Sequence, residues 1–448
     1  MHWDKLLSDK ILGKSKDERE SVRSSFERDF DRIIFSYPFR RLQDKTQVFP
    51  MPVHDFVHSR LTHSLEVSSV GRSLGKIAGE AIISRYSKLK NSNISPNDFG
   101  AIVAAASLAH DIGNPPFGHA GEKAISDFFI SSSPGQSFKN QLTMQQWEDI
   151  INFEGNAQGF KLLNKKEYQG LKLTYSTLLA FTKYPRESLV PGRNKERKSQ
   201  KKYGFFQSEK EIFKALAEEM ELIRLREDAF VWCRHPLAFL VEAADDICYN
   251  IIDLEDACRL DLVSYHDTQN LLAEVIGKQF QPEKLEKIRS RDEKLGILRA
   301  MAIGSLIKQS AEIFLEHEND ILSGNFDQAL TDKIISNGTM EEISKLSISK
   351  IYQSRPVLER EVTGFEVLHG LLETFTMAAL NYFKDPNACS ARDRNIIRLI
   401  PEEYQIFDQF TEGEEYDLLM NIIDFIASMT DKYAITLYRN IKGIAFPA

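Results

Sequence analysis

The sequence predicts an all-α fold. Apolar residues recur at steps of three and four along most of the chain, which is the spacing of one face of a helix. Alternating strand patterns are scarce, and the only segment in which we consider a short β-hairpin is residues 202–206. No internal repeat is found, so we expect helices of ordinary length packed around a core.

Two helices are predicted in the first quarter of the chain. The first starts at His63, and its apolar face consists of Val67, Val70, Leu74, Ile77 and Ala81. The second covers residues 95–111, where Ser95 can cap the helix, Pro96 suits the first helical position and Asp98 completes a capping box. Because this helix is apolar on nearly every side, we expect it to be buried.

Two further helices are predicted later in the chain. The third begins at Pro236, and its apolar face consists of Leu237, Leu240, Val241, Ala244, Ile247, Ile251 and Ile252. The fourth covers residues 421–442 as one amphipathic helix, with Gly443 as its stop.

Composition is typical of a globular protein with a large core. The chain has 448 residues, of which 42% are hydrophobic and 27% charged, and its net charge of −8 excludes a global basic field for nucleic acid. The four cysteines lack metal-type spacing, so we expect reduced thiols. The N-terminus lacks the apolar centre of a signal peptide, and no apolar run is long enough to span a bilayer, which predicts a cytoplasmic protein without a membrane partner.

One segment departs from the acidic average. Residues 183–202 contain eight Lys or Arg against two Glu, a local charge of +6. The two prolines and many polar residues predict a loop, which is either solvated or attracts anions.

Three His-Asp dipeptides occur, whereas the composition predicts fewer than one by chance. His266-Asp267 lies in a polar stretch and His54-Asp55 in a proline-broken loop. Only His110-Asp111 ends a helix that we expect to be buried, where two polar side chains are costly unless they are paired or bind a metal. Imidazole nitrogen together with carboxylate oxygen suits Mn, Fe or Mg.

Further metal ligands must come from elsewhere in the chain. His63 is one candidate, and the third helix offers another, since Asp245, Tyr249 and Asp253 follow one stripe at i, i+4 and i+8. Asp246 points about 100° away from Asp245, so Asp245 is the better candidate. The alternative is a surface acidic helix, with the histidines buried in the core.

A second polar pair follows the dipeptide. His119 and Glu122 are three residues apart, so they share a face if a helix begins there. A histidine supported by a carboxylate is a proton-transfer unit. A structural role for His119 is the alternative, but the stiff turn "DIGNPPFG" favours a histidine held near a metal.

Four motifs together resemble a known family. They are "HDIGNPPFGHAGE" (110–122), "FEGNAQGF" (153–160), "EAADDICYNIIDLEDA" (242–257) and "SMTDKYA" (428–434). In this order they look like the deoxyguanosinetriphosphate triphosphohydrolase family of the HD phosphohydrolase superfamily. The resemblance spans residues 29–443.

The resemblance implies hydrolysis of a deoxynucleoside triphosphate (dNTP), with dGTP preferred, to deoxynucleoside and intact triphosphate. It implies a divalent metal on His63, His110, Asp111 and Asp245, and a catalytic pair at His119 and Glu122. Substrate contacts are implied at Gln47, Arg60, Asn114, Lys183, Tyr184, Lys202, Tyr249 and Asp253. Among these, Arg60 matches a phosphate contact and Gln47 a contact near the sugar 3′-hydroxyl. Asn114 stands where a distant animal branch has another histidine, so proton transfer should rest on His119.

We expect residues 1–448 to form one unit, with an HD core at about 29–260 that includes the basic loop 183–202, and a C-terminal helical region at about 261–448. The resemblance also implies a homo-oligomer, often a hexamer in the family, and a nucleotide or single-stranded DNA effector. Two alternatives stay open. One is another HD phosphohydrolase, acting on nucleoside monophosphates or guanosine tetraphosphate; the other is a non-catalytic helical regulator that binds nucleotides.

Overall fold

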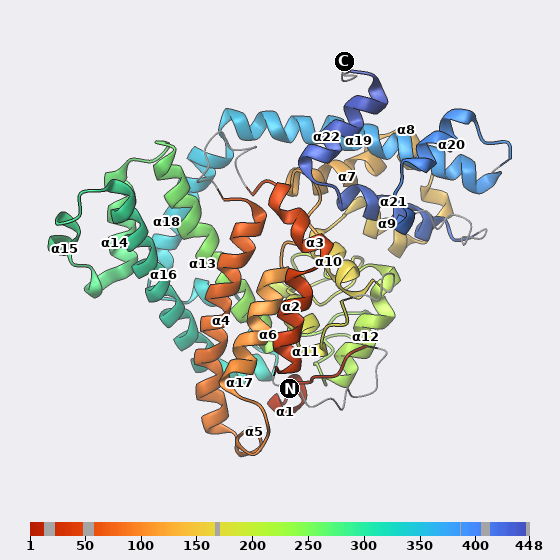
Figure 1. Ribbon diagram of the computed structural model, residues 1–448. Helices are drawn as coiled ribbons and strands as arrows, with labels where there is room; N and C mark the ends of the chain where they lie inside the picture. Colours follow the sequence, from red (N-terminus) through yellow and green to blue (C-terminus); the bar gives the residue numbers. More distant parts are fainter. Residues whose placement is uncertain (13–22, 48–57, 166–170, 386, 405–412, 445–448) are drawn as a thin grey trace.

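Helices account for almost all of the regular structure (Figure 1). The computed structural model describes residues 1–448 except 13–22, 48–57, 166–170, 386, 405–412 and 445–448. Within the described residues, β-structure is limited to four isolated bridges. The all-α prediction is therefore confirmed. The dipeptide His54-Asp55 lies outside the described residues.

The hairpin considered at residues 202–206 is wrong. This segment has no regular secondary structure and pairs with no strand; the Gly204 N–H donates to the Arg186 carbonyl at 3.1 Å. Its aromatic side chains point into two different apolar clusters: Phe205 into one, Tyr203 and Phe206 into the other. Burial of these rings in two clusters, rather than strand pairing, explains why the segment is rich in aromatic residues.

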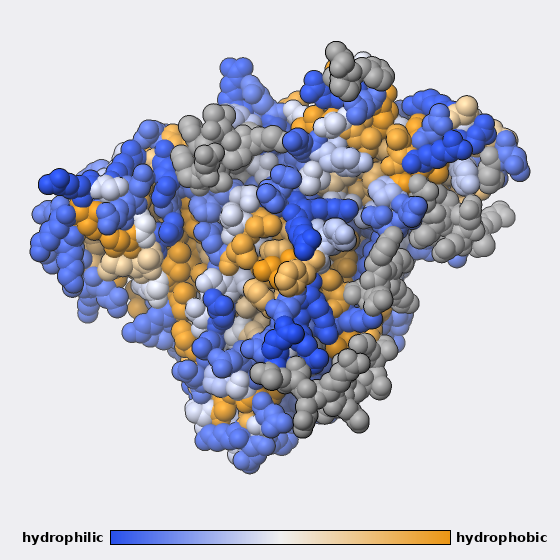
Figure 2. Space-filling view, viewed as in Figure 1, coloured by the Kyte–Doolittle hydropathy of each residue, from blue (hydrophilic) through white to orange (hydrophobic). Residues whose placement is uncertain are grey.

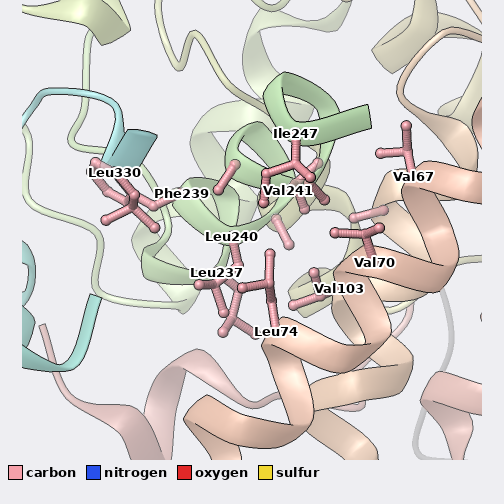
Figure 3. Close-up of a cluster of buried hydrophobic side chains, with 14 of the residues drawn as sticks. Val67, Val70, Leu74, Val103, Leu237, Phe239, Leu240, Val241, Ile247 and Leu330 are labelled. Atoms are coloured by element: carbon pink, nitrogen blue, oxygen red, sulfur yellow. The ribbon is translucent and has the colours of Figure 1, made fainter. Parts of the chain in front are cut away.

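Three long helices form the centre of the molecule (Figure 3). They are α4 (Arg60–Arg85), α6 (Pro96–Ala109) and α13 (Pro236–Arg259), and α6 packs extensively against α4 while α13 contacts both. Figure 3 shows Val67, Val70 and Leu74 of α4 facing Leu237 and Leu240 of α13. We call this apolar cluster the first core. It also takes residues from α2 (Ser25–Ile34), α11 (Tyr175–Phe181), α12 (Lys210–Glu219), α14 (Tyr265–Ile276), α16 (Arg291–Glu316) and α18 (Asn337–Ser347).

The predicted helices of the first core are confirmed, with one shift. The backbone N–H of Ser95 donates to the Asp98 carboxylate at 2.8 Å, which completes the capping box of α6. On α4, however, Ile77 is 40% exposed, and the buried face continues through Ala78 and Ile82. Successive steps of four keep that face on the core, so Ile77 and Ala81 lie beside it.

A second apolar cluster, which we call the second core, lies around α19 (Arg355–Lys384), the long helix across the top of Figure 1. Its other members are α7 (His119–Ser131), α9 (Met144–Ile151), α20 (Ala391–Arg398), α21 (Glu415–Ala427) and α22 (Asp431–Lys442). The two cores do not follow chain order, because α7 and α9 pack with the C-terminal helices. The proposed division near residue 260 stays a prediction.

The single helix predicted over residues 421–442 is wrong. The chain leaves the helix after Ala427, and Thr430 caps a new one by accepting from the Tyr433 N–H at 3.2 Å. Gly443 ends α22 in the left-handed conformation, with φ 67°, as predicted. The break at residues 428–430 turns α22 away from α21 and sets the position of Asp431.

The surface and the cysteines agree with the composition. Figure 2 shows hydrophilic residues over most of one face, with smaller apolar areas between them. No helix in the described part of the chain is long and apolar enough to cross a membrane. All four cysteines are free and buried.

Candidate active site

Three of the four expected metal ligands meet at one end of the first core. His63 lies in the first turn of α4, His110 follows the last turn of α6, and Asp245 is midway along α13. Asp245 Oδ1 lies 3.3 Å from His63 Nε2 and 3.4 Å from His110 Nε2. The three donor atoms lie within 4.8 Å of one another. We call this group the His-His-Asp cluster.

The protonation of His110 suits a metal ligand. His110 Nδ1 lies 2.7 Å from the Ser107 carbonyl oxygen, which can only accept, so Nδ1 carries the proton. The lone pair of Nε2 then faces His63 and Asp245, the arrangement in which a second partner fixes the tautomer of a metal-ligating histidine. Burial lowers the pKa of His110, but Asp111 and Asp245 outweigh it and raise that pKa. The cluster therefore favours a positive charge among these atoms, which is the property of a cation site.

Asp111 lies beside the cluster and points partly away from it. Asp111 Oδ2 accepts from Arg60 Nη1 at 2.6 Å, Oδ1 accepts from Asn114 Nδ2, and Oδ1 is 3.6 Å from His110 Nε2. Burial opposes ionisation, but Arg60 and His110 hold the pKa of Asp111 well below its ordinary value. Asp111 is thus an ionised carboxylate next to the three grouped ligands.

Asp245 and Asp246 differ as the helical geometry predicts. Lys183 Nζ donates to Asp245 Oδ2 at 2.6 Å, so a second cation lies against the cluster. Burial opposes ionisation of Asp245, but Lys183 and His110 hold the pKa of this carboxyl well below its usual range. Asp246 instead accepts from the Thr331 hydroxyl at 2.6 Å. Of the two carboxylates, Asp245 is the one that faces the histidines.

His119 and Glu122 form the predicted pair at the start of α7. Glu122 Oε2 lies 2.7 Å from His119 Nδ1, and the backbone N–H of Gly155 donates to Glu122 Oε1 at 2.7 Å. The side chain of Glu122 is 10% exposed, whereas that of His119 is 74% exposed. Burial opposes ionisation of Glu122, but His119 and Lys202 hold the pKa of this carboxyl below its usual value. A buried, ionised carboxylate thus orients an accessible imidazole.

The first glycine of "FEGNAQGF" lies very close to two side chains of the site. Gly155 begins α10 (Gly155–Asn164), where a Cβ atom would lie 2.5 Å from Asn114 Oδ1 and 2.8 Å from Glu122 Oε1. Only glycine lets this backbone reach both side chains. The backbone at Gly155 therefore packs against the side chains of Asn114 and Glu122.

Arg60 lies between the two groups. Its Nη1 donates to Asp111, and a Cβ atom on Gly118 would lie 2.4 Å from Arg60 Nη2. Gly118 directly precedes His119, so one guanidinium contacts both the Asp111 side and the His119 side. The His-His-Asp cluster and the His119–Glu122 pair are thus parts of one site.

Much of the basic loop is paired within the fold. Arg197 is 2.8 Å from Asp327 and Lys198 is 2.8 Å from Asp332, so these two charges are not directed at a ligand. Lys202 Nζ donates to Glu154 at 2.9 Å and lies 3.9 Å from Glu122. A cavity of about 680 Å³ opens beside it, lined among others by Glu122, Arg186, Arg193, Lys201 and Lys202. Tyr184 follows Lys183, and burial raises the pKa of its hydroxyl.

The expected sugar-contact residues form a third group. The ring of Tyr249 stacks on Tyr352, with centroids 6.0 Å apart and planes at 4°, and the Tyr352 hydroxyl donates to Asp253. Burial raises the pKa of Asp253 to about 7. Gln47 Oε1 is buried and has no hydrogen-bond partner among the described residues. Gln47 Oε1 makes no hydrogen bond to Tyr249 or Asp253.

Several residues at the site were missed from the sequence. Tyr352 lies in a π-helical turn (Ile348–Tyr352) far from any motif, so no signal pointed to it. Glu154 lies within "FEGNAQGF" and Asp431 within "SMTDKYA", which could have indicated both. Lys45 carries no motif, yet it is buried and contacts the "GNPPFG" turn.

Comparisons with known proteins agree with this geometry. The HD domain family matches residues 60–143, and the phosphohydrolase-associated domain family matches residues 336–440. The first match covers three of the residues discussed above as the centre of the site, His63, His110 and Asp111.

Full-length relatives are similar over nearly the whole chain. A deoxyguanosinetriphosphate triphosphohydrolase-like protein of Synechocystis sp. is 42% identical over 99% of this chain and 100% of its own. A protein of the same description from Pseudomonas aeruginosa is 36% identical over 100% of both chains. The deoxyguanosinetriphosphate triphosphohydrolase of Salmonella paratyphi A is 30% identical over 96% of this chain and 95% of its own. With that identity over its full length, the chain belongs to the deoxyguanosinetriphosphate triphosphohydrolase family of the HD superfamily and is a hydrolase that acts on phosphoric esters.

Proposed function

We propose that the protein hydrolyses dNTPs, with dGTP preferred, to deoxynucleoside and inorganic triphosphate, and that it requires a divalent metal. The observation that carries the proposal is the His-His-Asp cluster, joined through Arg60 to the His119–Glu122 pair. The names of the similar proteins favour dGTP over other substrates.

The metal would be held by His63, His110 and Asp245, with Asp111 as the fourth ligand. Asp111 Oδ1, which accepts from Asn114, is 3.6 Å from His110 Nε2, so a small rotation of this carboxylate would complete the set. Mn, Mg or Fe suits this nitrogen and oxygen set. When bound, such an ion supplies Lewis-acid stabilisation of charge on a phosphate oxygen.

The phosphates would be bound by cations already at the site. Lys183 lies against Asp245, and Arg60 lies against Asp111 and the Gly118 turn. Both are held by carboxylates that would also serve as metal ligands, so both cations lie where they could contact a phosphate beside a bound metal. Lys202, Tyr184 and Asn114 are the further candidates for phosphate contacts.

Proton transfer would rest on His119. Attack of water on the α-phosphorus releases the 5′-oxygen of the sugar, which needs a proton. With Nδ1 bonded to Glu122, His119 can deliver that proton from Nε2, and its exposure lets it exchange protons with solvent. Such help is typically worth about 10²–10⁴ in rate.

The sugar would be bound by Gln47, Tyr249 and Asp253. Gln47 Oε1 is buried and has no partner among the described residues, so it can accept a hydrogen bond from a sugar hydroxyl. The Tyr249 ring, fixed by Tyr352, offers an apolar face beside Asp253. A homo-oligomer and a nucleotide or single-stranded DNA effector remain predictions from the family.

The direct test is release of inorganic triphosphate from each of the four dNTPs, with Mn present and with the metal removed by a chelator. We expect metal-dependent release of triphosphate, fastest from dGTP. Release of pyrophosphate or orthophosphate, or hydrolysis of guanosine tetraphosphate or nucleoside monophosphates instead, would support another HD phosphohydrolase. No turnover with any of these would support a non-catalytic regulator.

A further inference from the structure

The backbone immediately before His119 has an unusual conformation. Phe117 has φ 66°, and Gly118 has φ 60° with ψ −130°. The left-handed region is unfavourable for a bulky residue such as Phe117, so surrounding contacts must hold it there. Because α7 begins directly after this turn, the turn sets the position of His119.

Asp431 holds the Phe117 turn from the other side of the chain. Its Oδ1 accepts from the Phe117 N–H at 3.0 Å, and its Oδ2 accepts from the Thr46 N–H at 3.4 Å. Asp431 is the first residue of α22 and is 4% exposed. The helix break at residues 428–430 brings it to the turn, so the motif "SMTDKYA" contacts the motif "GNPPFGH".

Two further groups hold the same turn. Lys45 Nζ donates to the Asn114 carbonyl at 2.5 Å and to the Ala427 carbonyl at 2.9 Å, which ties the beginning of the turn to the end of α21. Arg360 of α19 donates to the Phe117 carbonyl at 3.4 Å. The Phe117 ring covers Gly364, where a Cβ atom would lie 3.0 Å from it.

We propose that Asp431 is a positioning residue for proton transfer: by accepting from the Phe117 N–H, it holds the turn that aims His119 at the leaving oxygen. Phe117 is bonded from α19 and α22, and Lys45 joins the Asn114 carbonyl to the end of α21. The C-terminal helices would thus have a role in hydrolysis, because they would control the position of His119. The inference rests on the proposed role of His119 as the acid.

The first experiment compares Asp431→Ala with Asp431→Asn in dGTP hydrolysis with Mn. We expect Asp431→Ala to lower kcat by about 10- to 100-fold, because a misplacement of about 1 Å can cost 10²-fold. KM and bound metal should stay within twofold of the native values, since Asp431 contacts neither the cluster nor Lys183. Asp431→Asn keeps an oxygen that accepts from Phe117, so it should restore most of kcat.

Asp424→Asn is the matched control. Asp424 is also buried and in the second core, but it pairs with Lys161 at 3.1 Å and does not touch the turn. We expect it to affect thermal stability without a selective loss of kcat. If Asp431→Ala does not fold, Lys45→Met loosens the other end of the turn and should show the same loss of kcat.

The second experiment separates positioning from general destabilisation. In a His119→Ala background, Asp431→Ala should change kcat by less than about twofold, because residues that act as a unit are not additive. Equal losses in both backgrounds would overturn the inference, as would full kcat in Asp431→Ala. If His119→Ala itself retains full kcat, the proposed acid is wrong, which is a separate failure.

Discussion

The two cores contribute different parts of the site and hold them by different means. On the first core, three long helices bring His63, His110 and Asp245 together; the Ser107 carbonyl fixes the tautomer of His110, and, although burial opposes ionisation, Lys183 helps to hold the pKa of Asp245 well below its usual range. On the second core, His119 is 74% exposed at the start of α7 and is held by one carboxylate and a strained turn. In the proposed mechanism, metal binding would therefore depend on deep packing, whereas proton transfer would depend on a backbone turn that can be altered locally.

The largest expected effect comes from the first core. Asp245→Ala removes the carboxylate that lies 3.3 Å from His63 Nε2 and 3.4 Å from His110 Nε2. We therefore expect loss of bound metal and a fall in turnover of more than about 10³, the equivalent of about 4 kcal/mol of transition-state stabilisation. Metal content by atomic absorption and triphosphate release by ion chromatography measure the two effects.

Asp246→Asn is the control for this variant. Asp246 bonds to Thr331 rather than to the histidines, so metal content should stay near the native value. If Asp246→Asn loses the metal and Asp245→Ala keeps it, the ligand assignment on α13 is wrong.

The second effect comes from the second core. His119→Ala should keep the metal and lower kcat by at least about 10², since the imidazole is the proposed proton donor and contacts no residue of the cluster. Steady-state kinetics alongside metal analysis will show whether the two cores act separately. A variant that loses metal would mean that His119 belongs to the metal centre.

Local sequence patterns predicted much of the first core and of the candidate site. The period of three and four located α4, α6 and α13, and a buried His-Asp pair at the end of an apolar helix indicated a metal site. The stripe Asp245, Tyr249 and Asp253 follows from helical spacing alone. The distance from His119 to Glu122 likewise follows from their spacing of three.

The remaining features depend on contacts between distant segments. Tyr352 meets Asp253 across 99 residues, and Asp431 meets Phe117 across 314, so no local pattern predicts either pair. The break before Asp431 was missed because residues 421–442 keep a helical period through it. The sequence predicted that the basic loop is either solvated or attracts anions, but Asp327 and Asp332, far along the chain, pair with two of its charges.

The third prediction concerns pH and the stability of each core. His235, in the first core, donates from Nε2 to the Leu6 carbonyl at 2.9 Å, and burial lowers its pKa to about 4. Its contribution to stability is full above about pH 6.5 and is lost as pH falls toward 4. Asp149, in the second core, has its pKa raised by burial to about 6, so its contribution is full at low pH and is lost as pH rises from about 4 through 6.

Between pH 4 and 6.5 the contributions of His235 and Asp149 to the free energy of unfolding change in opposite directions. Each contribution changes by up to about 3 kcal/mol. His235→Asn removes a contribution that increases with pH. The slope of the free energy of unfolding against pH should therefore be less positive, or more negative, in this variant than in the native protein. Asp149→Asn should change the slope in the opposite sense. Urea unfolding at several pH values measures both slopes, and identical slopes in all three proteins would contradict the assignment.

The smallest expected effect concerns the sugar and tests whether a third group acts independently of both cores. Tyr249 is only partly buried, and its ring is held parallel to Tyr352, so it is not simply a core aromatic. One helical turn from Asp245, it lies where a sugar next to the α-phosphate would sit. A rigid ring there leaves little room for a 2′-hydroxyl, but apolar contacts reject an added hydroxyl only modestly.

We therefore expect Tyr249→Ala to lower the preference for dGTP over GTP by about tenfold, while metal content stays native. Tyr249→Phe keeps the ring and should keep the preference. Turnover of both nucleotides by folded variants decides the matter: an unchanged ratio in Tyr249→Ala would show that the selection for deoxyribose is made elsewhere, with Gln47 and Asp253 as the next residues to change.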